Sequence, residues 1–381
     1  MSEDGKKLKP LQRFPEFLQA GDWKVAPLGV LCDVLNNRRR PITGSDRERG
    51  EFPYYGASGI VDYVNGYIFD ERLLLVGEDG AKWGAYEKTA FIVEGKYWVN
   101  NHAHVLKATA INDSFLENYL VKLDLSPFVT GAAPPKLTLG KLKGIPIPFP
   151  PTIQEQKKIA DCLSSLDELI TAEEMRLDTL KSNKKGLMQQ LFPLKGKVIP
   201  SLRFPEFRDA GEWRMKSFDK LFTVGNGRDY KHLLTGEVPV YGSGGYMLSV
   251  NDFLYDGESV CIGRKGTINN PIFLTGKFWT VDTLFYTHSF KECLPKFIYL
   301  IFQNINWLDH NEAGGIPSLA KANILKIEVA VPGLGEQKKI VDCLSSIDFL
   351  ISSQTEKVDL LKAHKRGLLQ QLFPVHDEDA S

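Results

Sequence analysis

Two stretches of the chain show the same regular alternation of apolar and polar positions. Apolar residues recur at steps of four and three in residues 155–191 and again in residues 336–372. This spacing of 3.5 residues is sustained over about four heptads, which is typical of a helix that pairs along one narrow seam. We therefore expect two long helices that form a coiled coil. The predicted seam positions are Ile159, Leu163, Leu166, Ile170, Leu177, Leu180 and Leu187 in the first helix, and Ile340, Leu344, Ile347, Ile351, Val358, Leu361 and Leu368 in the second.

Each helix has a predicted beginning or end. Thr152 and Glu155 have the spacing of a capping box before the first apolar seam. Both helices end at "LFP", where Pro193 or Pro374 stops the helical hydrogen bonding. The segment between the helices joins the end of one to the start of the other, and a parallel pair would require it to span about 50 Å. The helices are therefore predicted to be antiparallel.

The helices belong to a tandem repeat that covers nearly the whole chain. The segment "RFPEFLQAGDW" at Arg13 returns as "RFPEFRDAGEW" at Arg203, and "PYYGASGIV" at Pro53 returns as "PVYGSGGYM" at Pro239. Identity is concentrated in the helices and falls between them, so the pattern indicates one fold with two different surfaces. The predicted fold class is α+β: two similar α/β domains separated by a pair of long antiparallel coiled-coil helices, in a pseudo-twofold tandem repeat. The predicted boundaries are 1–150 for the first domain, 151–193 for the first helix, 194–332 for the linker and second domain, 333–375 for the second helix, and 376–381 for the tail.

Composition narrows the class of protein. The 47 basic and 47 acidic residues give a net charge of zero, which argues against a protein that coats nucleic acid without specificity but allows a local basic face. The start "MSEDGKKLKPLQRF" has no apolar segment of the kind found in signal peptides, and no apolar run reaches the ~18 residues of a membrane helix. These features predict a cytoplasmic protein. The five cysteines are scattered without a CxxC pair, so neither a disulfide framework nor a zinc site is expected.

Basic residues lie near glycines and prolines in both halves. A pseudo-twofold protein with two different recognition domains suits double-stranded DNA, because symmetric readers place their half-sites along one duplex. Basic side chains on loops can reach phosphates, and arginine can read guanine edges. The candidate DNA-binding residues are Arg38, Arg39, Arg40, Lys82, Lys136 and Lys141 in the first half, and Arg228, Lys231, His232, Arg264, Lys265 and Lys321 in the second.

No motif for catalysis is recognisable. The string "VGNGRDY" lacks the third glycine of a nucleotide-binding loop, and "GRKGT" lacks the spacing of a phosphate-binding loop. The string "NNPIF" lacks the second proline of the amino-methyltransferase signature that it superficially resembles. His102 and His104 lie two apart, but the second half has no matching histidines, so a metal role is not expected. We predict no catalytic residue and no metal ligand.

These features together closely resemble the specificity subunit of type I restriction-modification systems over essentially the whole chain. The resemblance rests on the two "EQKKI-DCLSS-D-LI" helices, the two "LFP" helix ends, the "PEF-AG-W" openings, and "NGRDYKHL", "PVYGSGG" and "GRKGTI" in the second half. In the first half, "NNRRRPITGSDRERG" is a looser version of the glycine-rich loop.

The resemblance implies a non-catalytic subunit with two target recognition domains. Each domain would read one half of a bipartite, asymmetric DNA sequence, and the helices would set the spacer and dock two modification subunits. Those partners would bind S-adenosylmethionine and methylate adenine, which must be flipped into their own pocket. A restriction subunit would add ATP- and Mg-dependent cleavage, so this chain itself needs no cofactor. The alternative function is a non-catalytic coiled-coil scaffold without sequence-specific DNA binding.

Overall fold

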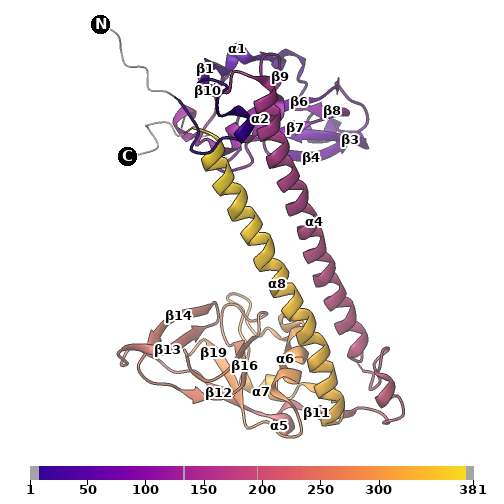
Figure 1. Cartoon of the computed structure of the whole chain (residues 1–381). Coiled ribbons are helices and arrows are strands. Elements are labelled where there is room, and N and C mark those ends of the chain that lie inside the picture. Colours follow the sequence, from indigo (N-terminus) through magenta and orange to yellow (C-terminus); the bar gives the residue numbers. More distant parts are fainter. Residues whose placement is uncertain (1–7, 132–133, 195, 375–381) are drawn as a thin grey trace. The chain divides into compact units, whose positions relative to one another are not determined.

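The computed structural model describes residues 8–131, 134–194 and 196–374, so the predicted tail at 376–381 lies outside the described residues. The chain divides into two compact units. The first unit combines Met1–Met175 with Glu356–Ser381, and the second unit is Arg176–Thr355. Each unit contains one domain of strands and short helices together with part of both long helices (Figure 1).

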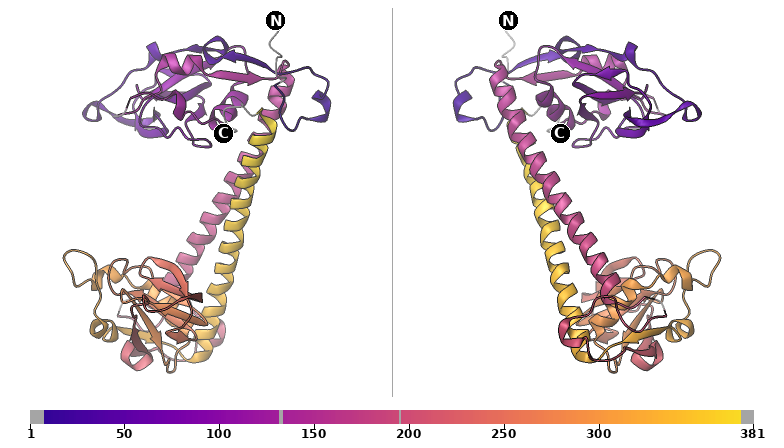
Figure 2. Two further views of the ribbon diagram at one scale, coloured as in Figure 1. Left: turned by 90° about the vertical axis from the view of Figure 1, so that its left-hand side faces the viewer. Right: turned by 90° about the vertical axis from the view of Figure 1, so that its right-hand side faces the viewer.

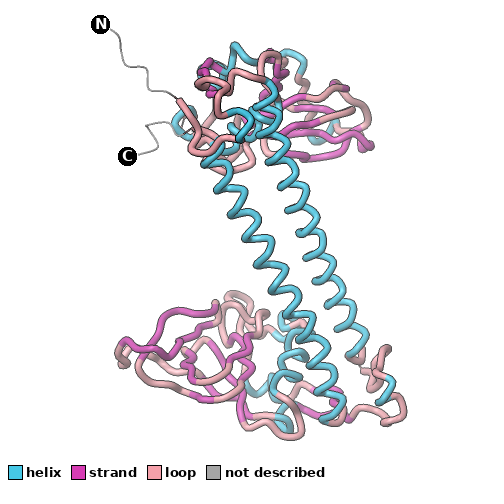
Figure 3. The backbone as a smooth tube through the Cα atoms, in the orientation of Figure 1, coloured by secondary structure: helices cyan, strands magenta, loops and turns pink. Residues whose placement is uncertain are grey.

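The described residues of the first unit's domain form three sheets and three short α-helices (Figure 3). One sheet pairs β1 (Lys24–Pro27) with β10 (Pro146–Phe149); another has the order β2 (Cys32–Val34), β9 (Ala103–Ala108), β6 (Leu73–Gly77), β7 (Ala90–Val93); the third has the order β4 (Gly59–Val64), β3 (Arg49–Gly56), β8 (Lys96–Val99), β5 (Phe69–Asp70). The short helices are α1 (Leu28–Leu31), α2 (Asp113–Lys122) and α3 (Leu139–Gly144). Strand β6 is the run "LLLVG", which is buried throughout, as expected for a central strand covered on both faces.

The domain of the second unit repeats this topology strand for strand. Its sheets are β11 (Arg214–Ser217) with β20 (Glu328–Val331); β12 (Thr223–Asn226), β19 (Leu284–His288), β16 (Ser259–Gly263), β17 (Ile272–Leu274); and β14 (Gly245–Val250), β13 (Thr235–Gly242), β18 (Lys277–Thr280), β15 (Tyr255–Asp256). The short helices are α5 (Phe218–Leu221), α6 (Pro295–Asn304) and α7 (Lys321–Leu325). In each domain one pair of strands is parallel, β3 with β8 and β13 with β18, at the same place in the order. The prediction of two similar α/β domains in a tandem repeat is confirmed.

The two long helices are α4 (Ile153–Leu191) and α8 (Leu334–Leu372). Both end one residue before a Phe-Pro pair, because the residue before a proline avoids the helical conformation. The predicted capping box at the start of α4 forms only in part. The backbone N–H of Glu155 donates to the Thr152 hydroxyl over 3.4 Å, but the Glu155 carboxylate turns away to accept two hydrogen bonds from Arg13.

Ion pairs between α4 and α8 show that the two helices run in opposite directions. In the first unit the Lys365 ammonium lies 2.6 Å from the Asp167 carboxylate, and in the second unit Lys184 lies 2.6 Å from Asp348. The first half of α4 therefore meets the last half of α8, and the last half of α4 meets the first half of α8. Figure 2 shows the magenta start of α4 beside the yellow end of α8 in both views. The helices pack together antiparallel, as predicted.

The predicted seam positions of both helices are buried or half-buried, and none is exposed. The buried ones are Ile159, Leu163, Ile170, Leu177, Ile340, Leu344 and Val358, and the half-buried ones are Leu166, Leu180, Leu187, Ile347, Ile351, Leu361 and Leu368. The seam residues near the helix ends also pack into the cores of the domains, so that each long helix contributes to both a helix pair and a domain.

The core of each domain includes a phenylalanine that directly follows the C-terminal end of a long helix. Phe373, directly after α8, is fully buried in the first unit and contacts Trp23, Phe115 and Tyr119, with ring centroids 5.0–6.2 Å apart. The equivalent Phe192, after α4, stacks on the core of the second unit in the same way. The "LFP" motif is therefore a tertiary anchor as well as a helix stop.

Backbone hydrogen bonds join the segment before each domain to the end of a long helix. In the first unit the N–H of Gln12 donates to the Gln371 carbonyl over 2.9 Å, and in the second unit the N–H of Leu202 donates to the Gln190 carbonyl over 2.9 Å. The start of the chain thus meets the end of α8 as the linker meets the end of α4.

Candidate nucleic-acid interface

The second domain has a cavity at the carboxyl end of the buried strand β16. Gly263 ends this strand where an added Cβ would lie 2.0 Å from the Thr267 carbonyl oxygen, so only glycine fits the tight turn. The turn presents Arg264 and Lys265 side by side. Two backbone hydrogen bonds hold Arg264 in place. Its N–H donates to the Thr283 carbonyl over 2.8 Å, and its carbonyl accepts from the Leu319 N–H over 2.9 Å.

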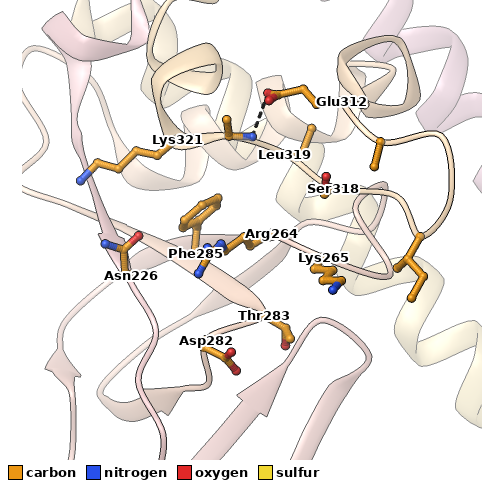
Figure 4. A pocket seen from close by; sticks show the side chains of 13 residues that line it. Asn226, Arg264, Lys265, Asp282, Thr283, Phe285, Glu312, Ser318, Leu319 and Lys321 are labelled. Carbon is orange, nitrogen blue, oxygen red and sulfur yellow. Dashed lines mark hydrogen bonds between the residues drawn. The ribbon is translucent and has the colours of Figure 1, made fainter.

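This cavity has a volume of about 1100 Å³ and combines basic, acidic and apolar side chains. Arg264 and Lys265 line it and are exposed, and Lys321 lines it from the start of α7, with its ammonium directed away from Lys265 (Figure 4). The ring of Phe285, which also lines the cavity, is buried. The Glu312 carboxylate accepts hydrogen bonds from the Ala320 N–H and the Asn323 amide over 2.9 and 2.8 Å, which holds the start of α7 in place. The lining residues are Asn226, Arg264, Lys265, Asp282, Thr283, Phe285, Glu312, Ala313, Ile316, Ser318, Leu319, Ala320 and Lys321.

A second cavity of about 710 Å³ adjoins the first and shares Asp282 and Thr283 with it. It is lined by the loop that carries Lys231 and by the β13–β14 turn. The loop is held close to the sheet because a Cβ on Gly227 would lie 1.9 Å from the Val281 carbonyl oxygen. The structure therefore brings Lys231, Arg264, Lys265 and Lys321 of the predicted residues to two neighbouring cavities.

The other two predicted residues of this domain lie beside the second cavity. The carbonyl of Arg228 accepts a hydrogen bond from the Trp279 indole over 2.8 Å, and the ring of His232 packs against Trp279 at 5.8 Å. Both side chains are exposed. Asn226, Asp282 and Thr283 line the cavities and are not among the predicted residues, although Asn226 begins the string "NGRDYKHL".

The first domain has a different set of side chains at the matching turn. Glu78 and Asp79 follow β6, and the Glu78 N–H donates to His102 while Leu137 donates to Glu78, each over 2.8 Å. Glu78 and Arg264 therefore make the same two backbone hydrogen bonds, with partners at equivalent positions of the repeat. Acidic residues in the first domain therefore occupy the places of Arg264 and Lys265 in the second.

Most predicted basic residues of the first domain are paired with its own carboxylates. The pairs are Arg38 with Glu71 at 2.8 Å, Arg39 with Glu78 at 2.7 Å, Lys82 with Glu87 at 3.9 Å, and Lys136 with Asp79 at 2.8 Å. Arg40 and Lys141 are exposed, and the part of the chain that the structure describes offers neither of them an ion pair.

The acidic pair is held by specific hydrogen bonds. Burial raises the pKa of Asp79, but hydrogen bonds from Lys136 and His102 outweigh this effect and keep the pKa of Asp79 below its ordinary value. His104 is buried: its Nε2–H donates a hydrogen bond to the Leu137 carbonyl over 2.7 Å, and its Nδ1 accepts one from the Asn36 amide over 2.9 Å. Both histidines thus have structural partners. Within the described ranges no group of three or more His, Cys, Asp or Glu side chains is arranged to hold a metal ion.

Comparison with known proteins gives the family. A model of the type I restriction modification DNA specificity domain matches the chain twice, at residues 20–182 and 210–363. The two matches cover most of the chain and coincide with the two halves of the repeat. The chain belongs to the family of type I restriction-modification specificity subunits.

Similar proteins span the same length as this specificity subunit. A candidate type I restriction enzyme specificity subunit of Haemophilus influenzae is 29% identical over 362 residues, covering 89% of this chain and 90% of that protein. The MjaVIII specificity subunit of Methanocaldococcus jannaschii is 24% identical over 415 residues and 92% of each chain. The crystal structure of the S subunit from M. genitalium shares the fold, with a TM-score of 0.69, 15% identity, and coverage of 97% of this chain and 100% of that one.

The identification settles what each part of the specificity subunit is. The two α/β domains are target recognition domains, the subunit is a non-catalytic component, and it belongs to a type I restriction-modification complex. The family match favours this function over the alternative of a scaffold without DNA recognition. None of the described helices is long and apolar enough to cross a membrane.

Proposed function

We propose that each target recognition domain reads one half of a bipartite, asymmetric site in double-stranded DNA, in the cytoplasm, where the chromosome lies. The observation that carries this proposal is the contrast at the matching turn. One scaffold, with the same backbone hydrogen bonds, carries Glu78 and Asp79 in one domain and Arg264 and Lys265 in the other. Carboxylates accept hydrogen bonds from base amino groups, whereas arginine and lysine donate to guanine and phosphate. Two domains built in this way suit two different half-sites.

The candidate contact residues keep their places in this proposal. In the second domain they are Arg228, Lys231, His232, Arg264, Lys265 and Lys321. In the first domain Arg40 and Lys141 are the candidates without an ion pair among the described residues, whereas Arg38, Arg39, Lys82 and Lys136 would first have to leave their carboxylate partners to contact DNA. Lys231, Arg264, Lys265 and Lys321 support the assignment because they line two adjoining cavities.

A domain exchange tests the proposal. Residues 205–330 would be replaced by the matching domain of another family member, and the methylated motif would be read by sequencing. We expect one half of the motif to change and the other to remain. A change in both halves would contradict modular reading.

The paired helices are proposed to dock two modification subunits that methylate adenine, and through them a restriction subunit. Leu169 of α4 and Leu350 of α8 support this role, since they occupy equivalent positions of the repeat and are 43% and 50% exposed. Two equivalent apolar contacts suit two copies of one partner.

Leu169→Asp and Leu350→Asp should each lower the number of bound modification subunits from two to one, measured by native mass spectrometry. Lys157→Asp, on the exposed surface of α4, serves as a control for added charge.

A further inference from the structure

The two target recognition domains differ in how their basic side chains are used. In the first domain, Arg38, Arg39, Lys82 and Lys136 each lie within 4 Å of a carboxylate of the same domain. In the second domain, the structure gives Arg264, Lys265 and Lys321 neither an ion pair nor a side-chain hydrogen bond among the residues it describes. The same holds there for Arg228 and Lys231.

The contrast is sharpest at an isolated β-bridge, a single pair of hydrogen-bonded backbone positions that both domains share. In the first domain the bridge joins Asp79 to Lys136, whose side chains form an ion pair over 2.8 Å. In the second domain the equivalent bridge joins Lys265 to Ser318, which has no charge to offer. The first domain therefore has its own anion at a place where the second domain has an unneutralised cation.

The acids that line the first cavity of the second domain do not replace that missing anion. The Glu312 carboxylate is occupied by the backbone N–H of Ala320 and the amide of Asn323. Asp282 also lines the cavity, and no ion pair joins it to a cation in the described part of the chain. Three cations thus remain available to an anion that enters from solvent.

We infer that Arg264, Lys265 and Lys321 of this cavity bind backbone phosphates of the DNA, one phosphate for each cation, and that the first domain has no equivalent phosphate site at the matching turn. This inference rests on the proposed DNA-reading function. A cation that already has a carboxylate partner must give up that pair to bind a phosphate, so it gains little and releases few counterions. An unpaired cation releases its share of the DNA counterions on binding. The second domain therefore supplies the larger part of the salt-dependent affinity. The first domain, in which only Arg40 and Lys141 of the candidate residues are unpaired in the described part of the chain, supplies the smaller part.

The test compares two matched triple variants of the full-length chain. R264Q/K265Q/K321Q removes the three cavity cations, and R38Q/K82Q/K136Q removes three paired cations from the first domain. The probe is a fluorescein-labelled 40-base-pair duplex of random sequence, because phosphate contacts do not depend on sequence. Fluorescence anisotropy from 50 to 200 mM salt gives the slope of log affinity against log salt concentration for each protein.

Each lost phosphate contact lowers this slope by about 0.9. We expect R264Q/K265Q/K321Q to lower the slope by about two to three, and R38Q/K82Q/K136Q to change it by less than about one. Equal reductions in both variants, or no reduction in the first, would overturn the inference. If the unaltered chain shows no salt-dependent binding to the duplex, the proposed function itself fails, which is a separate outcome.

Single substitutions guard against loss of folding. Lys136→Gln and Lys265→Gln alter the one lysine at the matching bridge of each domain. Circular dichroism would verify that both variants keep the native fold. Lys265→Gln should lower the slope by about 0.9 and Lys136→Gln should leave it nearly unchanged. The reverse order would overturn the inference as well.

Discussion

The buried ion pair between Arg203 and Glu336 offers a quantitative test of how each domain is joined to its helix pair. Arg203 belongs to the repeated "RFPEF" segment and Glu336 to the repeated "EQKKI" segment. Two parallel hydrogen bonds of 2.8 and 2.7 Å join the guanidinium to the carboxylate, and the Trp213 indole donates a third over 3.2 Å. The side chains are only 10% and 3% exposed. The hydrogen bonds to the Glu336 carboxylate raise the pKa of Arg203, so the buried guanidinium stays charged.

Replacement of Glu336 by glutamine would leave the Arg203 charge buried without a partner. Breaking a buried pair from one side costs about 3–5 kcal/mol, and glutamine retains one acceptor, so we expect about 3 kcal/mol. For a unit of this size 1 kcal/mol corresponds to about 2–4 °C in the melting temperature, which predicts a decrease of about 6–12 °C for the second unit. Urea unfolding at pH 7, followed by tryptophan fluorescence and hydrogen exchange, measures the effect.

Two controls separate the buried charge from other causes. Arg208→Gln removes an exposed arginine from the same segment and should change the stability by less than about 0.5 kcal/mol. R203M/E336L removes both charges and should recover most of the loss, since no unpaired charge remains. A loss below about 1 kcal/mol for Glu336→Gln would mean that the pair behaves like an exposed one, and the reasoning would be refuted.

Three further predictions concern stability. L166D/L180D places two charges in the half-buried helix seam and should lower the helical signal and the melting temperature; an unchanged helix pair would contradict the seam assignment. Phe373→Ala removes a fully buried ring from the first unit and should cost about 3–5 kcal/mol in urea unfolding, so a cost below 1 kcal/mol would show that the core does not depend on the end of α8. Burial lowers the pKa of His104 below its ordinary 6.5, so unfolding takes up a proton as the pH falls through this value, and stability is lost at acid pH. His104→Phe removes this titration, so its stability deficit relative to the unaltered chain should shrink from pH 7.5 to pH 5.5, and a constant deficit would contradict the assignment.

The long-range architecture could be predicted from sequence because its signals are periodic. The seam positions repeat every 3.5 residues, and an identical pattern appears twice in register. The antiparallel direction was predicted from the connection between the helices, which a parallel pair would force to span the whole length of a helix. The ion pairs of Lys365 with Asp167 and of Lys184 with Asp348 agree with it.

The contacts that join each domain to its helices were missed. The Glu155 carboxylate binds Arg13, 142 residues earlier in the chain, and local spacing suggested a capping partner instead. The joint recurrence of "RFPEF" and "EQKKI" was a usable signal, because two segments that repeat together can contact each other in each copy. Gln337, next to Glu336, has a similar role: its amide accepts from Leu294 and donates to Pro332.

The state of the basic residues could not be predicted from sequence at all. Arg38 and Arg39 read as two members of one exposed cluster, but they bind Glu71 and Glu78, which lie 33 and 39 residues away. Arg264 and Lys265 lie between Gly263 and Gly266, but this local sequence does not show that they lack an ion pair. Pairing of charges is decided by the register between strands, and register is a property of the folded domain.

The central claim is that this subunit sets the DNA sequence that its complex recognises. Single-molecule sequencing for N6-methyladenine, in DNA from a methylation-free host expressing this chain with its modification subunit, tests the claim most directly. We predict a bipartite motif that is methylated in both halves and is absent when this chain is omitted. A stable complex that methylates no motif, or the same motif with and without this chain, would contradict the account.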